Sequence, residues 1–250
     1  MNIEFSDVKV DLGRAEILHG VSVCANDGQV TGIVGANGSG KSTLIKTLFG
    51  IVAPKAGEIT VGGQSVATIG RRKLASMVGY VGQDSATVFD FSVRDVVGMA
   101  AGLRADRGSL KEVDIVSAAL EELGISRLEN RGIQSLSGGE RKMVFIARAV
   151  AQGVDTIVLD EPTNHLDIKH QLFILDYLRS SGKTVLVVLH DLRLAAHFCD
   201  ELYLVKSGRN VCSGTPSETL TRENVREVFG VRGEAFLDPE DGMDFKLYMS

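Results

Sequence analysis

Three short, nearly continuous apolar runs constrain the fold of this chain more than any other feature. They are QVTGIVG at 29–35, DTIVLDE at 155–161 and KTVLVVLHD at 183–191. The runs are rich in β-branched residues and do not alternate with polar ones, which is typical of strands covered on both faces of a parallel sheet. Helical patterns such as GERKMVFIARAV lie between them. This alternation predicts an α/β fold with a mostly parallel sheet.

Each of these runs ends in polar residues. The first leads into Gly35–Thr43, the second ends in Asp160 and Glu161, and the third ends in His190 and Asp191. Ligands of open parallel sheets bind beyond the carboxyl ends of the strands. If the three strands are neighbours, their polar ends therefore converge on one site.

The segment GANGSGKST at 35–43 matches the pattern G-x-x-x-x-G-K-[ST] and lies between a predicted strand and a predicted helix. Its glycines let consecutive backbone N–H groups point at phosphate oxygens. Lys41 supplies a positive charge for the β- and γ-phosphates, and Ser42 offers a hydroxyl to Mg²⁺. The candidate nucleotide-binding residues of the loop are Gly35, Asn37, Gly38, Ser39, Gly40, Lys41, Ser42 and Thr43.

The segment TIVLDEP places two adjacent carboxylates at a strand end. Neighbours on a strand point to opposite faces, so Asp160 and Glu161 are expected to have separate roles. Asp160 is the candidate for the Mg²⁺ sphere, and Glu161 is the candidate for orienting and deprotonating an attacking water. The alternative is that one of them caps a turn at Pro162. Taken alone, His190 and Gln83 are more typical of a hydrogen-bonded strand end and a solvated loop.

A second candidate anion site lies in SLSGGERK at 135–142. Ser137 and Glu140 have the spacing of a capping box before a predicted helix. A helix N-terminus with glycines that allow close approach is suited to an anion. The residues of this site are Ser137, Gly138, Gly139 and Glu140. One nucleotide does not need two such sites, and the spacing alone does not explain the second.

Composition argues against several other classes of protein, although it leaves a local basic patch open. The net charge of −5 argues against nonspecific binding of nucleic acid. Cys24, Cys199 and Cys212 lack metal-ligand spacing, which suggests reduced thiols in a cytosolic compartment. The N-terminus shows no signal-peptide pattern, and no apolar run reaches the roughly 18 residues of a membrane span. If the protein works at a membrane, another chain must hold it there.

We expect one domain over residues 1–250. It would comprise a lobe rich in antiparallel strands at about 1–85, a helical subdomain at about 86–150, a core at about 151–215, and a C-terminal helix and hairpin at about 216–250.

Together these residues resemble the nucleotide-binding subunit of an ATP-binding cassette (ABC) transporter over essentially the whole chain. The matching motifs, in order, are the Walker A loop Gly35–Thr43, the Q-loop Gln83, the signature Leu136-Ser137-Gly138-Gly139-Glu140, the Walker B stretch Ile157–Asp160 with Glu161, the D-loop Asn164-His165-Leu166-Asp167 and the switch His190. The resemblance implies ATP and Mg²⁺ as cofactors and ATP hydrolysis coupled to transport. It implies that Glu161, His190 and Gln83 are catalytic, and that Ser42, Gln83 and Asp160 surround the metal.

The resemblance also explains the second anion site. In this family two nucleotide-binding domains pack head to tail, and the signature of one contacts the γ-phosphate of ATP held by the other. The implied partners are a second copy of the chain, polytopic membrane permease subunits and, indirectly, an extracytoplasmic substrate-binding protein, with no nucleic acid. The implied location is the cytoplasmic face of the membrane. The signature has SGGE where SGGQ is commoner, which changes only its fifth position.

DEPTNHLDIKHQ and VVLHDLRLAAHFCDELYLVKSGR are similar to ATPases of importers for iron–siderophores, heme and cobalamin. The closest alternative is an exporter subunit or an importer for another solute. A P-loop kinase or GTPase does not need the signature, and ABC-type DNA-repair ATPases carry long coiled coils that this chain lacks. An inactive ATP-binding subunit is disfavoured because Glu161 and His190 are both present.

The chain departs from the family pattern in three places. Leu12 aligns where many members stack an aromatic residue on adenine, with Phe5 and Phe89 as other aromatic candidates. Gly82 replaces a common proline before Gln83. The segment VVGMAAGLRADRGSL, in the region expected to face the membrane partner, is shorter than usual.

Overall fold

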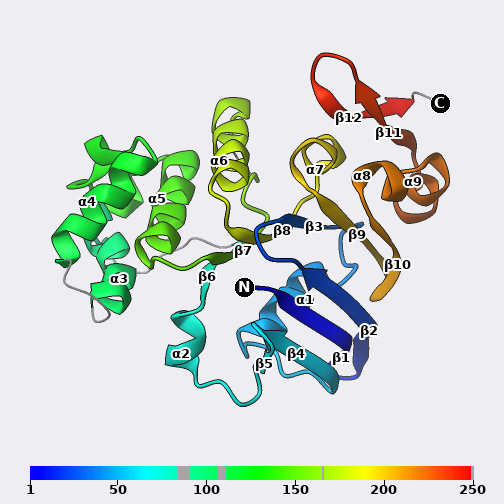
Figure 1. Ribbon diagram of the computed structural model, residues 1–250, viewed down its shortest axis with the longest axis horizontal. Helices are drawn as coiled ribbons and strands as arrows, with labels where there is room; N and C mark the ends of the chain where they lie inside the picture. The colour runs from blue at the N-terminus through cyan, green and yellow to red at the C-terminus, as the bar shows by residue number, and fades with distance from the viewer. Residues whose placement is uncertain (84–89, 106–110, 165, 249–250) are drawn as a thin grey trace.

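A six-stranded sheet forms the centre of the computed structural model, which describes residues 1–83, 90–105, 111–164 and 166–248 (Figure 1). In sheet order the strands are β10 (Arg209–Gly214), β9 (Glu201–Lys206), β3 (Val30–Val34), β8 (Thr184–Val188), β7 (Thr156–Asp160) and β6 (Val78–Val81). Neighbouring strands are parallel except β9 and β10, which form an antiparallel hairpin. Every residue of β3, β7 and β8 is buried, so the predicted α/β fold with a mostly parallel sheet is confirmed.

The three strands singled out in the sequence are direct neighbours. β8 pairs with β3 on one side and with β7 on the other, and Asp160 lies opposite Val188. The carboxyl ends of β3, β7 and β8 therefore meet at one edge of the sheet. The chain leaves this edge at the phosphate loop, at Glu161 and at His190.

A four-stranded antiparallel sheet packs beside the centre. Its order is β2 (Ala15–Ala25), β1 (Ile3–Leu12), β4 (Ala56–Val61) and β5 (Gln64–Ser65). Helix α1 (Lys41–Leu48) lies between the two sheets, because Leu44 and Leu48 share a buried cluster with Phe5 of β1 and Val158 of β7. This packing fixes the start of α1 directly after the phosphate loop.

Helices form a separate group at one end of the molecule, at the left of Figure 1. The group comprises α3 (Val93–Ala105), α4 (Glu112–Glu122) and α5 (Gly138–Ala151), with short 3₁₀ turns at Ser126–Leu128 and Ile133–Ser135. The shorter helix α2 (Arg71–Ala75) precedes β6, and α6 (Ile168–Ser180) and α7 (Leu192–Phe198) follow β7 and β8. Within the described residues, no helix combines the length and apolarity needed to cross a bilayer.

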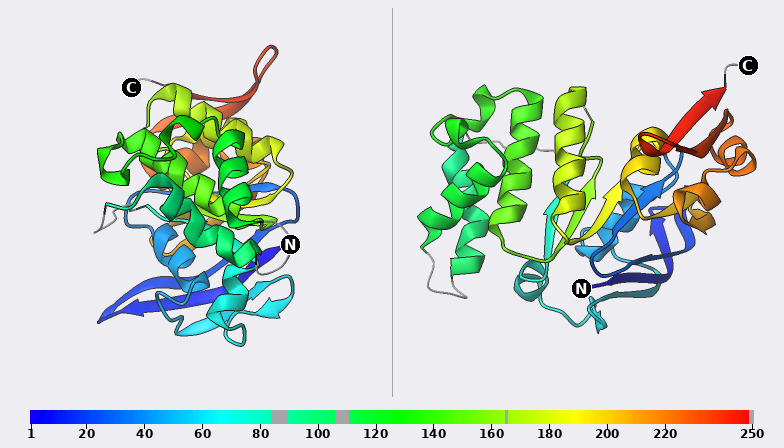
Figure 2. Two further views of the ribbon diagram at one scale, coloured as in Figure 1. Left: turned by 90° about the vertical axis from the view of Figure 1, so that its left-hand side faces the viewer. Right: turned by 45° about the horizontal axis from the view of Figure 1, so that its top comes forward.

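The C-terminal region lies at the opposite end from the α3–α5 group (Figure 2). It contains α8 (Pro216–Thr219), α9 (Arg222–Phe229) and the antiparallel hairpin of β11 (Arg232–Asp238) and β12 (Gly242–Tyr248). The single helix predicted before the hairpin is thus two helices. The break has a local cause: Leu220 leaves helical geometry, and the Thr221 side chain accepts a hydrogen bond from Asn224 N and starts a new helix.

Candidate active site

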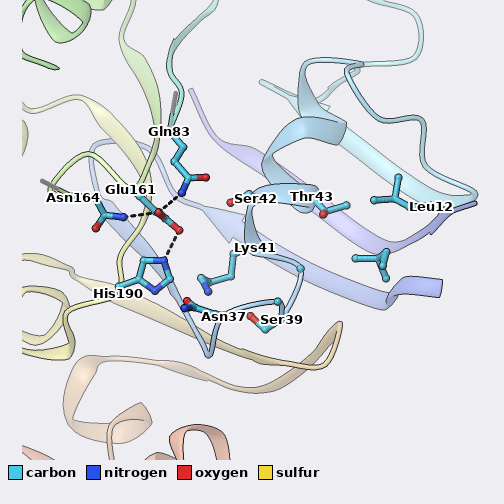
Figure 3. Close-up of a pocket in the computed structure, with 13 residues that line it drawn as sticks. Leu12, Asn37, Ser39, Lys41, Ser42, Thr43, Gln83, Glu161, Asn164 and His190 are labelled. Carbon is cyan, nitrogen blue, oxygen red and sulfur yellow. Dashed lines mark hydrogen bonds and ion pairs between the residues drawn. The ribbon is translucent and has the colours of Figure 1, made fainter. Parts of the chain in front are cut away.

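An open pocket of about 910 Å³ lies at the edge where β3, β7 and β8 end (Figure 3). It is lined by Leu12, Ile17, Asn37, Gly38, Ser39, Gly40, Lys41, Ser42, Thr43, Gln83, Glu161, Asn164 and His190. The three polar strand ends predicted to converge do line one pocket.

The phosphate loop follows β3 and ends at α1. Gly35 has to be a glycine, since a Cβ there would lie 2.1 Å from the carbonyl oxygen of Val205. Gly40 adopts φ 101° at the start of α1, a conformation that side chains rarely tolerate. The loop conformation therefore depends on both glycines, because Gly35 packs against β9 and Gly40 makes the turn into α1.

Lys41 is almost fully buried beneath this loop. Its Nζ donates to the carbonyl oxygens of Gly35 at 2.8 Å and Ala36 at 3.1 Å. Burial lowers the pKa of the Lys41 ammonium, while the carboxylates of Glu161 and Asp160 oppose that shift. A positive charge held here by two neutral acceptors is suited to an anionic ligand such as a triphosphate.

Asp160 is the last residue of β7, and its side chain faces α1. Its Oδ1 accepts a hydrogen bond from Ser42 Oγ at 3.0 Å, and its Oδ2 is buried without a hydrogen-bond partner among the described residues. Burial raises the pKa of the Asp160 carboxyl, which the Ser42 hydrogen bond partly offsets. A hard cation bound by oxygen would use the unpartnered Oδ2 and relieve the cost of the buried charge. Asp160 and Ser42 therefore fit Mg²⁺.

The side chain of Glu161 points away from that of Asp160 and into the pocket. Its side chain is 7% exposed, and Oε2 accepts hydrogen bonds from Gln83 Nε2 at 2.8 Å and Asn164 Nδ2 at 2.6 Å. Oε1 meets the Nε2 atom of His190 in a short contact (Figure 3). The backbone of Glu161 has φ 53°, a left-handed conformation that costs free energy for a residue other than glycine. Three side chains from three segments thus fix one carboxylate in a strained turn.

Two pocket residues were not predicted as such. Asn164 was noted only as part of the D-loop, and its bond to Glu161 depends on a turn that brings residues three apart together. Ile17, on β2, lines the apolar end together with Leu12, a residue that is 47% exposed. Phe5 is buried inside the β-lobe and does not reach the pocket, and Phe89 lies outside the described residues.

The signature segment forms the predicted capping box at the start of α5. Ser137 Oγ accepts from Glu140 N at 3.2 Å, and Glu140 Oε2 accepts from Ser137 N at 3.2 Å. None of Ser137, Gly138, Gly139 and Glu140 lines the pocket within the described part of the chain. The two candidate anion sites of one chain are therefore separate.

The D-loop connects the pocket to α6. Asp167 caps α6 by accepting a hydrogen bond from His170 N at 2.9 Å, and Leu166 is buried. His165 lies outside the described residues.

Gln83 hydrogen-bonds to Glu161 rather than to Ser42 or Asp160, so its predicted contact with the metal stays a prediction.

Comparison with known proteins extends these observations. The family profile described as "ABC transporter" matches residues 18–164. The cobalamin import ATP-binding protein of Halobacterium salinarum is 36% identical over 97% of this chain, and the match spans 62% of that protein's length. The hemin import ATP-binding protein of Bordetella avium is 36% identical, with 96% of this chain and 97% of that protein covered.

Solved structures give a similar result. An inward-facing ABC transporter assigned to the metal-chelate type superposes with a TM-score of 0.81 at 26% identity, covering 99% of this chain and 98% of that one. A dimeric bacterial ABC transporter cassette superposes with a TM-score of 0.76 at 25% identity, covering 85% and 98%.

Proposed function

Because this chain belongs to the ABC transporter family, whose ATP-binding domains hydrolyse ATP, we propose that it powers uptake of heme, cobalamin or an iron–siderophore chelate through partner permease subunits. The single observation that carries the catalytic part is the Glu161 carboxylate, held by Gln83, Asn164 and His190 in the pocket that contains Lys41.

In the proposed complex, one end of the pocket binds the phosphates of ATP and the other end binds its base. The backbone N–H groups of the phosphate loop and the Lys41 ammonium bind the β- and γ-phosphates, while Leu12 and Ile17 cover one face of the base. Ser42 and Asp160 would hold Mg²⁺, which when bound supplies positive charge to the phosphate oxygens.

Glu161 is the general base in this proposal. An ionised carboxylate accepts a proton from the water that attacks the γ-phosphate, provided that the carboxylate is oriented toward that water. His190 at Oε1, with Gln83 and Asn164 at Oε2, sets this orientation. The neighbouring Asp160 cannot take this role because it faces Ser42.

Two copies of the chain are needed for the complete site. The signature and the phosphate loop are separate within one chain, so the signature of each copy would reach the nucleotide of the other. The proposed assembly is a homodimer of this chain bound at the cytoplasmic face of the membrane to polytopic permease subunits. An extracytoplasmic substrate-binding protein delivers the substrate.

The names of the relatives support the substrate class. Hemin and cobalamin are both large metal chelates, and the metal-chelate type transporter covers nearly the whole chain. The test is reconstitution in proteoliposomes with candidate permease subunits and a candidate substrate-binding protein from the same genome. We expect ATP-dependent uptake of one of hemin, cobalamin or a ferric siderophore, and none with the Glu161→Gln variant. ATP-dependent efflux, or uptake of an unrelated solute only, would contradict the proposal.

A further inference from the structure

The signature segment carries a negative charge at the place where the proposed function needs to receive a phosphate. Glu140 is the third residue of α5, and its side chain is 19% exposed. The backbone N–H of Ser137 holds the pKa of the Glu140 carboxyl below its usual value; burial opposes this, and the nearby Arg127 and Arg131 add to it. Glu140 is therefore ionised at neutral pH, and its charge would repel an approaching γ-phosphate.

Glu140 also occupies the Ser137 hydroxyl. Ser137 Oγ donates to Glu140 Oε2 at 3.2 Å while it accepts from Glu140 N at 3.2 Å. A serine hydroxyl has one proton to donate. If that proton is held by the carboxylate, it is not available to a phosphate oxygen, and this competition grows with the negative charge on Oε2.

Arg127 bonds the other oxygen of the same carboxylate. Its Nη1 donates to Glu140 Oε1 at 3.1 Å, from the 3₁₀ turn before the signature. The Arg127 side chain is 63% exposed, so this pair contributes little to folding on its own. The position of Arg127 matters more than this stability. Its positive charge lies at Oε1, the carboxylate oxygen that does not contact Ser137, and offsets the negative charge of Glu140.

Two other arginines hold the backbone of the preceding loop. Arg131 donates to the carbonyl oxygen of Ser135 at 2.9 Å, and Arg141 donates to that of Ile133 at 3.3 Å. The loop conformation is thus supported independently of Arg127. Removing Arg127 should change the charge and orientation of Glu140 with little effect on the loop.

We propose that Arg127 is a positioning residue that acts through Glu140. It offsets the carboxylate charge so that the Ser137 hydroxyl and the N-terminus of α5 can receive the γ-phosphate of a nucleotide bound to a second copy of the chain. The inference rests on the proposed function, and it applies to this chain because its signature ends in glutamate. A glutamine at position 140 would carry no charge and would not need the arginine.

The test measures the ATP concentration at which the chain dimerises, by size-exclusion chromatography in the Glu161→Gln background. We expect Arg127→Ala to raise the ATP midpoint on the order of fivefold, the size expected for a charge at a solvent-facing site. In the Glu140→Gln background, the same Arg127 substitution should change the midpoint by less than about twofold. Arg127→Lys should behave like arginine because it keeps the charge.

A matched control is Arg94→Ala, which breaks an ion pair of the same kind to Glu129 that involves neither Ser137 nor Glu140. It should leave the ATP midpoint unchanged. Salt gives a second readout: raising the ionic strength should narrow the gap between Arg127→Ala and its parent, because screening weakens charge repulsion.

The outcomes separate the alternatives. An equal effect of Arg127→Ala in both backgrounds would mean that Arg127 acts on the phosphate directly or on the fold, and would overturn the inference. No effect in either background would overturn it as well. If the Glu161→Gln parent fails to dimerise with ATP at all, the proposed function fails and the inference with it.

Discussion

Glu161 and His190 lie 29 residues apart in the chain and meet through Oε1 and Nε2 at the carboxyl edge of the central sheet. The pairing of β7 with β8 brings them together, since Asp160 and Val188 are opposite each other and each strand ends one or two residues before the contact. The backbone N–H of Glu161 donates to Val188 O at 3.2 Å, which ties the strained turn to the sheet. The contact is therefore built into the sheet register.

Replacing His190 with alanine should slow ATP hydrolysis by about tenfold to a hundredfold, because the Glu161 carboxylate loses one of its three partners and its orientation. ATP binding should change little, because the phosphate loop is untouched. Steady-state phosphate release and nucleotide titration measure the two effects. His197→Ala is the control, because His197 contacts Met243 O outside the pocket. Equal losses in the two variants would contradict the role.

Replacing Asp160 with asparagine should stabilise the nucleotide-free protein, because it removes a buried negative charge while keeping the shape of the side chain. Burial raises the pKa of the Asp160 carboxyl above 3.8 in the folded protein. The ionised carboxylate therefore lowers the free energy of unfolding at neutral pH. This destabilisation disappears as the pH falls through the pKa of the folded state toward the pKa of the unfolded state. Unfolding monitored from neutral to acidic pH in EDTA should show the difference between the two proteins shrinking.

The same Asp160→Asn variant should lose its response to Mg²⁺. Wild-type protein with ATP should be stabilised further by Mg²⁺, while the variant should not. Asp155→Asn, an exposed carboxylate beside the same strand, is the control. A variant that is less stable than wild type in EDTA, yet responds normally to Mg²⁺, would show that Asp160 is structural.

Replacing Leu12 with tyrosine should tighten ATP binding. Leucine covers a base by dispersion only, and the difference from an aromatic ring is on the order of 1 kcal/mol, or about fivefold. Since Leu12 and Ile17 are both aliphatic, we expect wild type to accept GTP nearly as well as ATP. Titration of both proteins with both nucleotides tests this. Strong ATP preference in wild type with unchanged affinity in the variant would mean that the base lies elsewhere.

Cysteines placed at Ser137 and Asn37 should crosslink only between chains. Both residues are exposed, one at the start of α5 and the other on the phosphate loop, and they belong to separate sites in one chain. The native cysteines are replaced first, and the two new ones are put on differently tagged copies and mixed with ATP. A parallel sample puts both cysteines on one chain. A crosslink within that chain, together with none between the two tagged copies, would contradict the head-to-tail arrangement.

Local sequence patterns predicted much of this structure. The buried strands β3, β7 and β8 follow from their continuous apolar runs, and the capping box of α5 follows from the spacing of Ser137 and Glu140. Both signals are local: one depends on burial of each residue in a run, and the other on hydrogen bonds within one helical turn.

Local sequence patterns could not predict the contacts of the Glu161 carboxylate. Gln83 reaches it from 78 residues away, and this meeting depends on the order of the strands, which apolar periodicity does not specify. The bond from Asn164 depends on the left-handed backbone of Glu161, which a propensity argument disfavours for glutamate. The break at Thr221 had a local signal, the capping threonine, which the helical pattern on both sides obscured.

The central claim is that Glu161 is the general base for ATP hydrolysis, and the most direct test is phosphate release by the Glu161→Gln variant. Glutamine keeps the shape of the side chain but cannot accept the proton, so turnover should fall by about 10²–10⁴ while ATP affinity stays within about twofold of wild type. The exposed Glu58→Gln variant should keep full activity. Turnover of Glu161→Gln within a few-fold of wild type would contradict the account.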